Sequence, residues 1–228
     1  FRALESDVLD LFARWDAGWY FWIASYGYGS DFNPTRQSPI AFFPALPIAM
    51  RITGAVLDSN LWVAGIIVVL LAFFAGLTYV YRLALDEGLT PDQARTAVVL
   101  LAFYPFAVCY SVVLTEALFL LAAAAAFFHF RRGELWKAGL FGLATGLLRP
   151  NGFLLALPLG LIAMLPFARQ RGWLPWAERG PGLDVTTGRL AIQLAIAALP
   201  VVGMLLHAAH LYTVTGNPFA FVEVQQAW

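Results

Sequence analysis

Long apolar stretches fill most of the chain, and the polar residues gather in the short segments between them. A membrane-spanning helix needs roughly 20 apolar residues to cross about 30 Å of hydrocarbon, and six windows come close to that length. The six windows are residues 61–83, 96–110, 112–130, 135–148, 152–167 and 190–212. The pattern predicts an all-α membrane protein, a polytopic transmembrane helix bundle with about six spans.

Composition supports this class. Hydrophobic residues make up 61% of the 228 residues and charged residues 12%, with a mean hydropathy of +0.72, which is too apolar for a soluble domain. The net charge is zero and the basic residues are scattered, so no basic stripe favours nucleic acid. The single cysteine, Cys109, cannot form an internal disulfide. Because the chain begins at Phe1, we expect a signal anchor or first span to precede it.

Basic residues in short loops indicate which connections are cytoplasmic. They cluster at every second connection, and the intervening ones carry only Arg149. The basic positions are Arg82, Arg95, Arg131, Arg132, Lys137, Arg169, Arg171, Arg179 and Arg189. We therefore expect one transmembrane domain in which 1–60 is an extracytoplasmic loop with short interfacial helices, 61–212 is the bundle and 213–228 begins another extracytoplasmic loop.

Two segments need separate interpretation. Residues 39–57 are apolar but contain three prolines and Arg51, and counting them as a span would invert every later loop. We interpret them as an interfacial or re-entrant segment rather than a span. Residues 172–188 are rich in Gly and Pro and are expected to form a cytoplasmic loop.

One carboxylate stands among aromatic residues near the start of the chain. Asp16 follows Arg14 and Trp15 and precedes Trp19 and Tyr20. Aromatic faces beside a carboxylate are a common way to bind a sugar, because the rings stack on its C–H face while the acid accepts its hydroxyls. The alternative is an interfacial aromatic belt with an Arg14–Asp16 ion pair.

Two further polar residues lie on the expected outer side. Glu116 stands at the start of a long apolar helix, where an acid also stabilises the helix dipole by about 0.3 to 1 kcal/mol. Arg149, followed by Pro150 and Asn151, ends a span on the side that is poor in basic residues. Its guanidinium matches a phosphate or a carboxylate, although a snorkelling contact with lipid headgroups is the alternative.

The remaining polar residues at membrane depth are less informative. His207 and His210 share one helix face, and we interpret them as core or pore-lining residues rather than metal ligands, since no acidic or Cys partner is near. Arg51 is a weaker candidate on the outer side. There is no glycine-rich phosphate loop, Walker lysine or nucleophilic elbow, which disfavours nucleotide-driven chemistry.

Five motifs in a fixed order make the sequence resemble bacterial PIG-V-like mannosyltransferases, which are GPI mannosyltransferase II-like members of the GT-C class of integral-membrane glycosyltransferases. The motifs are RWDAGWYFWIASYGY at 14–28, AFFPALP at 41–47, YPF at 104–106 with LTEALF at 114–119, RPNG at 149–152 and TGNPF at 215–219.

The resemblance implies a many-helix GT-C fold and a sugar, mannose first of all, carried from a polyprenyl- or dolichyl-phosphate donor to a lipid or glycan acceptor. It implies an extracytoplasmic active site in a bacterial plasma membrane, and no cofactor or metal. Asp16 matches the acid of the first-loop motif and becomes the candidate base. Gly18 replaces a histidine common in the eukaryotic pattern, so the acceptor here can differ.

Physical reasoning adds the other roles. Arg149 suits the donor phosphate, and Glu116 suits an acceptor hydroxyl or the positioning of Arg149. The remaining candidate substrate-binding residues are Asn151, Arg14, Trp15, Trp19 and Tyr20. Direct displacement predicts inversion at the anomeric carbon. The rival functions are a transporter or flippase of a lipid-linked substrate and a non-catalytic membrane subunit, and the enzyme requires Asp16 and Arg149 to converge on one cavity.

Overall fold

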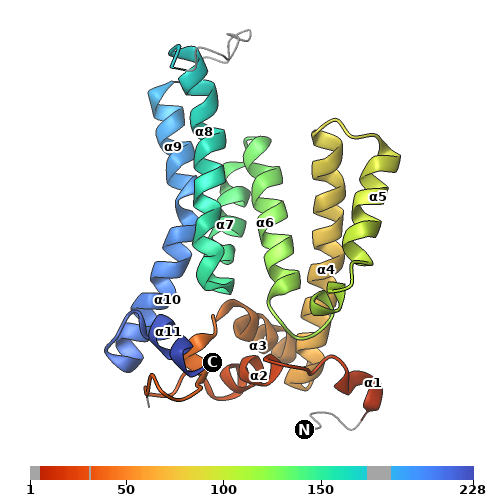
Figure 1. Ribbon diagram of the computed structural model, residues 1–228, viewed down its shortest axis with the longest axis vertical. Helices are drawn as coiled ribbons and strands as arrows, with labels where there is room; N and C mark the ends of the chain where they lie inside the picture. Colours follow the sequence, from red (N-terminus) through yellow and green to blue (C-terminus); the bar gives the residue numbers. More distant parts are fainter. Residues whose placement is uncertain (1–5, 31, 174–185) are drawn as a thin grey trace.

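The computed structural model describes residues 6–30, 32–173 and 186–228, and within these ranges every regular element is a helix (Figure 1). The α-helices are α1 (Asp7–Asp10), α2 (Ala17–Tyr26), α3 (Ala45–Leu57), α4 (Leu61–Asp86), α5 (Pro91–Ala102), α6 (Glu116–Arg131), α7 (Leu135–Leu148), α8 (Ala156–Gln170), α9 (Thr187–Ala197), α10 (Leu199–Thr215) and α11 (Ala220–Glu223). The 3-10 helices are η1 (Pro39–Ala41), η2 (Ala107–Tyr110), η3 (Pro150–Leu155) and η4 (Val224–Ala227).

The helices form two parts. Helices α4 to α10 run along the long axis of the molecule, whereas α1, α2, α3 and α11 lie across one end of them (Figure 1). The α4–α5 and α6–α7 connections lie at the opposite end. The loop expected at 172–188 falls mostly outside the described residues. The protein is an all-α membrane protein, as the apolar pattern predicts.

Within the residues that the structure describes, fewer helices than six are long enough to span a membrane by themselves. Among the described residues, α4 and the combined η3–α8 segment pass by length and composition, and α9 with α10 is a third candidate if this pair, bent by 41°, counts as one span. Helices α5, α6 and α7 are 12, 16 and 14 residues long. The expected count of six spans therefore stays a prediction.

The proline-rich segment at 39–57 is divided into η1 and α3. Helix α3 has 13 residues, or about 20 Å at a rise of 1.5 Å per residue, which is short for a span. It ends where Asp58 adopts a left-handed conformation with φ of 45°. Helix α3 packs against α2 and α4 in the layer across the end of the bundle, a placement that suits an interfacial helix.

A buried cluster fastens this layer to the bundle. Ala17 and Tyr20 of α2 and Met50 of α3 are packed in one core with Val113, which precedes α6. The backbone N–H of Val113 also donates to the carbonyl of Phe12, at 2.9 Å. Asp16 directly precedes α2, and the packing of α2 in this core therefore restrains the position of Asp16.

Ion pairs join the helix ends at the opposite side of the bundle. Arg131 pairs with Glu87, and Arg132 lies 3.4 Å from Asp86, so the last turn of α6 is tied to the end of α4. These side chains are partly exposed, and each pair contributes little to stability. Their position agrees with the expected gathering of basic residues at one end of the molecule.

Candidate active site

Asp16 lies at the N-terminus of α2, directly after a residue with an unusual backbone. Trp15 has φ of 51°, in the left-handed region, which costs a bulky residue roughly 1–2 kcal/mol. Burial of Ala17 and Tyr20 in the core holds this turn in place. Strain of this kind gathers at functional sites, where the surrounding fold imposes one geometry on a reactive side chain.

The carboxylate of Asp16 is half-buried, and this burial raises its pKa. No ion pair or side-chain hydrogen bond of Asp16 occurs within the described ranges. Arg14 instead pairs with Asp10, at 3.3 Å. The alternative of an Arg14–Asp16 ion pair is therefore wrong. Asp10 stands four residues before Arg14 and is the carboxylate that pairs with its guanidinium.

Tyr20 is a buried residue of α2 that packs in one core with residues of α3 and α4 and of the segment that leads into α6. Its side chain is 7% exposed and shares a hydrogen bond with the side chain of Thr115. Burial raises the pKa of Tyr20 to about 12, and the charges of Glu116, Arg149 and Asp16 all act on its hydroxyl. All three candidate ionisable residues therefore lie close enough to influence this tyrosine, and Asp16 has the smallest effect.

Glu116 and Arg149 form an ion pair, with Nη1 of Arg149 at 3.3 Å from Oε1 of Glu116. The guanidinium also lies 6.0 Å from the ring of Phe119. The arginine side chain is 37% exposed and the glutamate side chain 27%, so both remain reachable by a ligand. The alternatives of helix capping for Glu116 and of snorkelling for Arg149 consider each residue separately. The structure instead joins the two residues in an ion pair between α6 and the end of α7.

The local sequence explains where Arg149 points. Helix α7 ends at Leu148 because Arg149 precedes a proline and takes an extended conformation, with φ of −150° and ψ of 150°. The chain then folds back as η3, and the backbone of Gly152 packs directly on α7. The hydroxyl of Thr145 donates to the carbonyl of Gly142 at 2.7 Å and lies 3.2 Å from that of Gly152.

We expect Gly152→Ala to destabilise the protein by about 1–3 kcal/mol or more, because the added Cβ would lie 1.9 Å from the carbonyl oxygen of Thr145. Thermal unfolding of the purified protein measures this change. Gly160→Ala in α8 is the matched control, since its Cβ has nothing within 4 Å and alanine favours a helix. Equal melting temperatures for the two variants would contradict this account of the α7–α8 corner.

Aromatic rings form a wall beside Asp16. Trp19 stacks on Phe42 at 5.9 Å, and Trp228 meets both rings edge-on, at 5.8 and 5.5 Å. Trp15 is 67% exposed, and Asn151 is exposed on η3. Thr115 and Trp228 were not among the sequence-based candidates. Nothing in the sequence near Asp16 points to Trp228, which only the fold brings to this wall.

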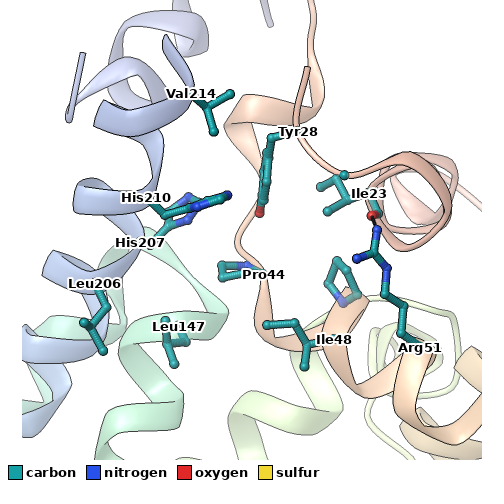
Figure 2. Close-up of a pocket in the computed structure, with 12 residues that line it drawn as sticks. Ile23, Tyr28, Pro44, Ile48, Arg51, Leu147, Leu206, His207, His210 and Val214 are labelled. Carbon is teal, nitrogen blue, oxygen red and sulfur yellow. Dashed lines mark hydrogen bonds between the residues drawn. The ribbon is translucent and has the colours of Figure 1, made fainter. Parts of the chain in front are cut away.

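A cavity of about 420 Å³ lies beside this cluster, between α2 and α3 on one side and α7 and α10 on the other (Figure 2). Its lining includes none of Asp16, Glu116 or Arg149. The lining residues are Ile23, Gly27, Tyr28, Pro44, Pro47, Ile48, Arg51, Leu147, Leu206, His207, His210 and Val214. This cavity is therefore not the shared one that the enzyme hypothesis requires of Asp16 and Arg149. The three weaker candidates, Arg51, His207 and His210, line it instead.

Gly18, the position expected to affect acceptor choice, has free space around it. Gly18 is exposed in the first turn of α2, and a Cβ built there meets nothing within 4 Å. A histidine at this position, as in the eukaryotic pattern, would project from the same end of α2 as Asp16. The structure therefore leaves free space beside the candidate base at this position.

Comparisons with known proteins concern the sequence of the chain and not the arrangement of these residues. The sequence model described as "Mannosyltransferase (PIG-V)" matches residues 2–164, a range that holds Asp16, Glu116 and Arg149. The GPI alpha-1,6-mannosyltransferase 2 of Cricetulus griseus and that of Mus musculus are each 30% identical to the chain over 159 residues, covering 65% of the chain. The chain spans 31% of the length of these curated relatives. No solved structure matches the chain.

Proposed function

Because this chain belongs to the PIG-V family of mannosyltransferases, we propose that the protein transfers mannose from a polyprenyl-phosphate-linked donor to a lipid or glycan acceptor. The observations that support the proposal are the Glu116–Arg149 ion pair and the influence of the charges of Glu116, Arg149 and Asp16 on the pKa of the buried Tyr20. This reaction needs one carboxylate to take a proton and one accessible guanidinium. Asp16, which has no cationic partner among the described residues, and Arg149 suit these two tasks.

The proposed reaction is a direct displacement. The carboxylate of Asp16 takes the proton of an acceptor hydroxyl, and the hydroxyl oxygen forms a bond to the anomeric carbon of the sugar. The bond between that carbon and the phosphate oxygen breaks, and polyprenyl phosphate leaves with the electron pair. Attack from the face opposite the phosphate inverts the anomeric centre. Arg149 offsets the charge on the leaving phosphate.

Phosphate on a lipid is a good leaving group, so the main task of the protein is to position the reactants. The aromatic wall of Trp19 and Trp228 suits the C–H face of a sugar, because flat rings stack on it. The proposal includes no resident cofactor or metal. Glu116 has two possible tasks, to orient Arg149 or to bind an acceptor hydroxyl.

A transfer assay tests the proposal. The protein in liposomes is supplied with polyprenyl-phosphate [³H]mannose and a membrane lipid extract, and radiolabelled product is separated by thin-layer chromatography. We expect labelled product from the lipid-linked donor and none from a nucleotide-linked mannose. Movement of the labelled lipid across the bilayer without sugar transfer would favour the flippase alternative and contradict the proposal.

We also propose that the site faces the extracytoplasmic side, since the basic residues gather at the other end of the bundle. Cys109 lies in η2, in the connection that leads to Glu116. In intact cells, an impermeant maleimide should modify Cys109, as read by peptide mass spectrometry. The control is Asp92→Cys in a Cys109→Ala background, at an exposed position of the opposite end, which should be modified only after permeabilisation. The reverse pattern would show that the site is cytoplasmic.

A further inference from the structure

The cavity beside the reacting cluster has an apolar lining with an open edge. Ile48 of α3 and Leu206 of α10 line it and are 50% and 52% exposed, so they form its rim. Helix α10 belongs to a bent pair of helices that is a candidate membrane span by length and composition. A ligand that enters here therefore has an apolar part that can remain in the bilayer.

One buried polar side chain in this cavity has no partner. His207 is 1% exposed, and neither ring nitrogen has a hydrogen-bond partner in the part of the chain that the structure describes. Its neighbours are rings, with Phe43 at 4.3 Å and Tyr28 at 5.6 Å. The Tyr28 hydroxyl donates to the carbonyl of Phe42 at 2.7 Å. A buried polar group without a partner is costly and calls for an explanation, which a polar ligand atom supplies.

A cation, Arg51, lies on the other side of the same cavity (Figure 2). Arg51 donates from Nε to the carbonyl of Ala24 at 2.5 Å and from Nη2 to that of Ile23 at 2.9 Å. These bonds fix the guanidinium at the end of α2 and leave further N–H donors free. No carboxylate lies within 4.0 Å of it among the described residues. A fixed guanidinium with free donors suits a phosphate group.

The cavity continues the face of α2 that carries the candidate base. Asp16, Tyr20, Ile23 and Gly27 are spaced by three or four residues, so they lie on one side of the helix. Ile23, on the cavity wall, is about 10 Å along the axis from Asp16. The donor phosphate must be bonded to the sugar at the reacting cluster, so it cannot also occupy a site this far away.

We propose that this cavity binds the phosphate-bearing headgroup of the lipid acceptor, with the phosphate on Arg51, a headgroup oxygen on His207 and the acyl chains leaving past Ile48 and Leu206. The inference rests on the proposed function, since it assumes that an acceptor is brought to Asp16. It assigns two lipid phosphates to two places, the donor phosphate to Arg149 and the acceptor phosphate to Arg51.

Direct lipid binding tests the proposal without sugar transfer. Native mass spectrometry of the detergent-solubilised protein, titrated with dioleoyl phosphatidylglycerol, gives a Kd. Dioleoylglycerol, which lacks the phosphate, and undecaprenyl phosphate are the comparison ligands. We expect Arg51→Gln and His207→Phe each to weaken phosphatidylglycerol binding about tenfold or more, as for a lost hydrogen bond to a charged group. Dioleoylglycerol binding should be unchanged.

Three variants complete the test. Arg36→Gln, at an exposed arginine in the segment between α2 and η1, should leave binding unaltered, and Arg51→Lys should recover part of it. Asp16→Asn should bind normally, so loss of transfer with intact binding separates the two proposals. Arg51→Gln removes the hydrogen bonds from Arg51 to the carbonyls of α2. If this variant unfolds, the affinity of His207→Phe for phosphatidylglycerol tests the proposal by itself. Equal binding of both dioleoyl lipids, unchanged affinity in His207→Phe, or an equal loss of undecaprenyl phosphate affinity in Arg51→Gln and His207→Phe would overturn the assignment.

Discussion

Asp16→Asn is expected to lower kcat for sugar transfer by about 10²- to 10⁴-fold, the usual contribution of a positioned general base. The amide has nearly the same shape as the acid but cannot accept the acceptor proton. Folding should be preserved, because burial already disfavours the charged carboxylate. The measurements are single-turnover transfer from polyprenyl-phosphate mannose and thermal unfolding of the same preparation.

Asp58→Asn is the matched control for this substitution. Asp58 is exposed at the end of α3, in the same layer as Asp16, and its left-handed backbone suits asparagine as well as aspartate. Its variant should transfer sugar at the wild-type rate. Wild-type turnover in Asp16→Asn would remove this residue as the base, and a lower melting temperature would mean that the carboxylate is structural.

The fall in kcat/KM at low pH is expected to report the protonation of Asp16. Burial raises the pKa of Asp16, so its protonation, which abolishes base function, sets in at a higher pH than for an ordinary carboxyl. Protonation of a group whose pKa is raised by folding adds stability as the pH falls, so this decrease in kcat/KM does not arise from unfolding at Asp16. The decrease should be absent in Asp16→Asn.

Sequence periodicity and breakers predicted a large part of the fold. The apolar windows marked the helices of the bundle, and Pro150 marked the end of α7 and hence the place of Arg149. The window at 96–110 was too long, because α5 ends at Ala102 shortly before Pro105, whose ring disfavours helical backbone in the residue before it. Local signals of this kind act within a few residues, so one sequence is enough to detect them.

Contacts between distant segments could not be predicted in the same way. The pairing of Arg14 with Asp10, the hydrogen bond between Tyr20 and Thr115, and the place of Trp228 on the aromatic wall depend on how helices pack. A helix period shows which residues share a face, but it does not identify the face of the partner. The two histidines were interpreted together as core or pore-lining residues. His207 is buried and His210 is exposed, and the cavity that both of them line became visible only in the fold.

Arg149→Ala is expected to lower kcat by about 10²- to 10³-fold, as for removal of one preorganised donor to a developing negative charge. The loss should depend on the leaving group, because the guanidinium offsets charge on the departing phosphate. Arg149→Lys should recover part of the rate, since it keeps the charge but loses the fork. Kinetics with phosphate- and phosphorothioate-linked mannose donors measure both effects, and an identical loss with both leaving groups would place Arg149 outside the reaction.

The Glu116–Arg149 pair permits a double-mutant cycle that separates the two roles open to Glu116. If Glu116 only orients Arg149 through their 3.3 Å contact, Glu116→Gln should cost activity in the wild type and almost none in the Arg149→Ala background. If Glu116 instead holds an acceptor hydroxyl, the two losses should multiply, and KM for the acceptor should rise with Glu116→Gln alone. Because Glu116 is 27% exposed beside an arginine that is 37% exposed, the ion pair by itself adds little to stability, so melting temperatures should stay close to wild type across the cycle. A large loss of stability in either single variant would assign the pair to the architecture of the bundle instead of to sugar transfer.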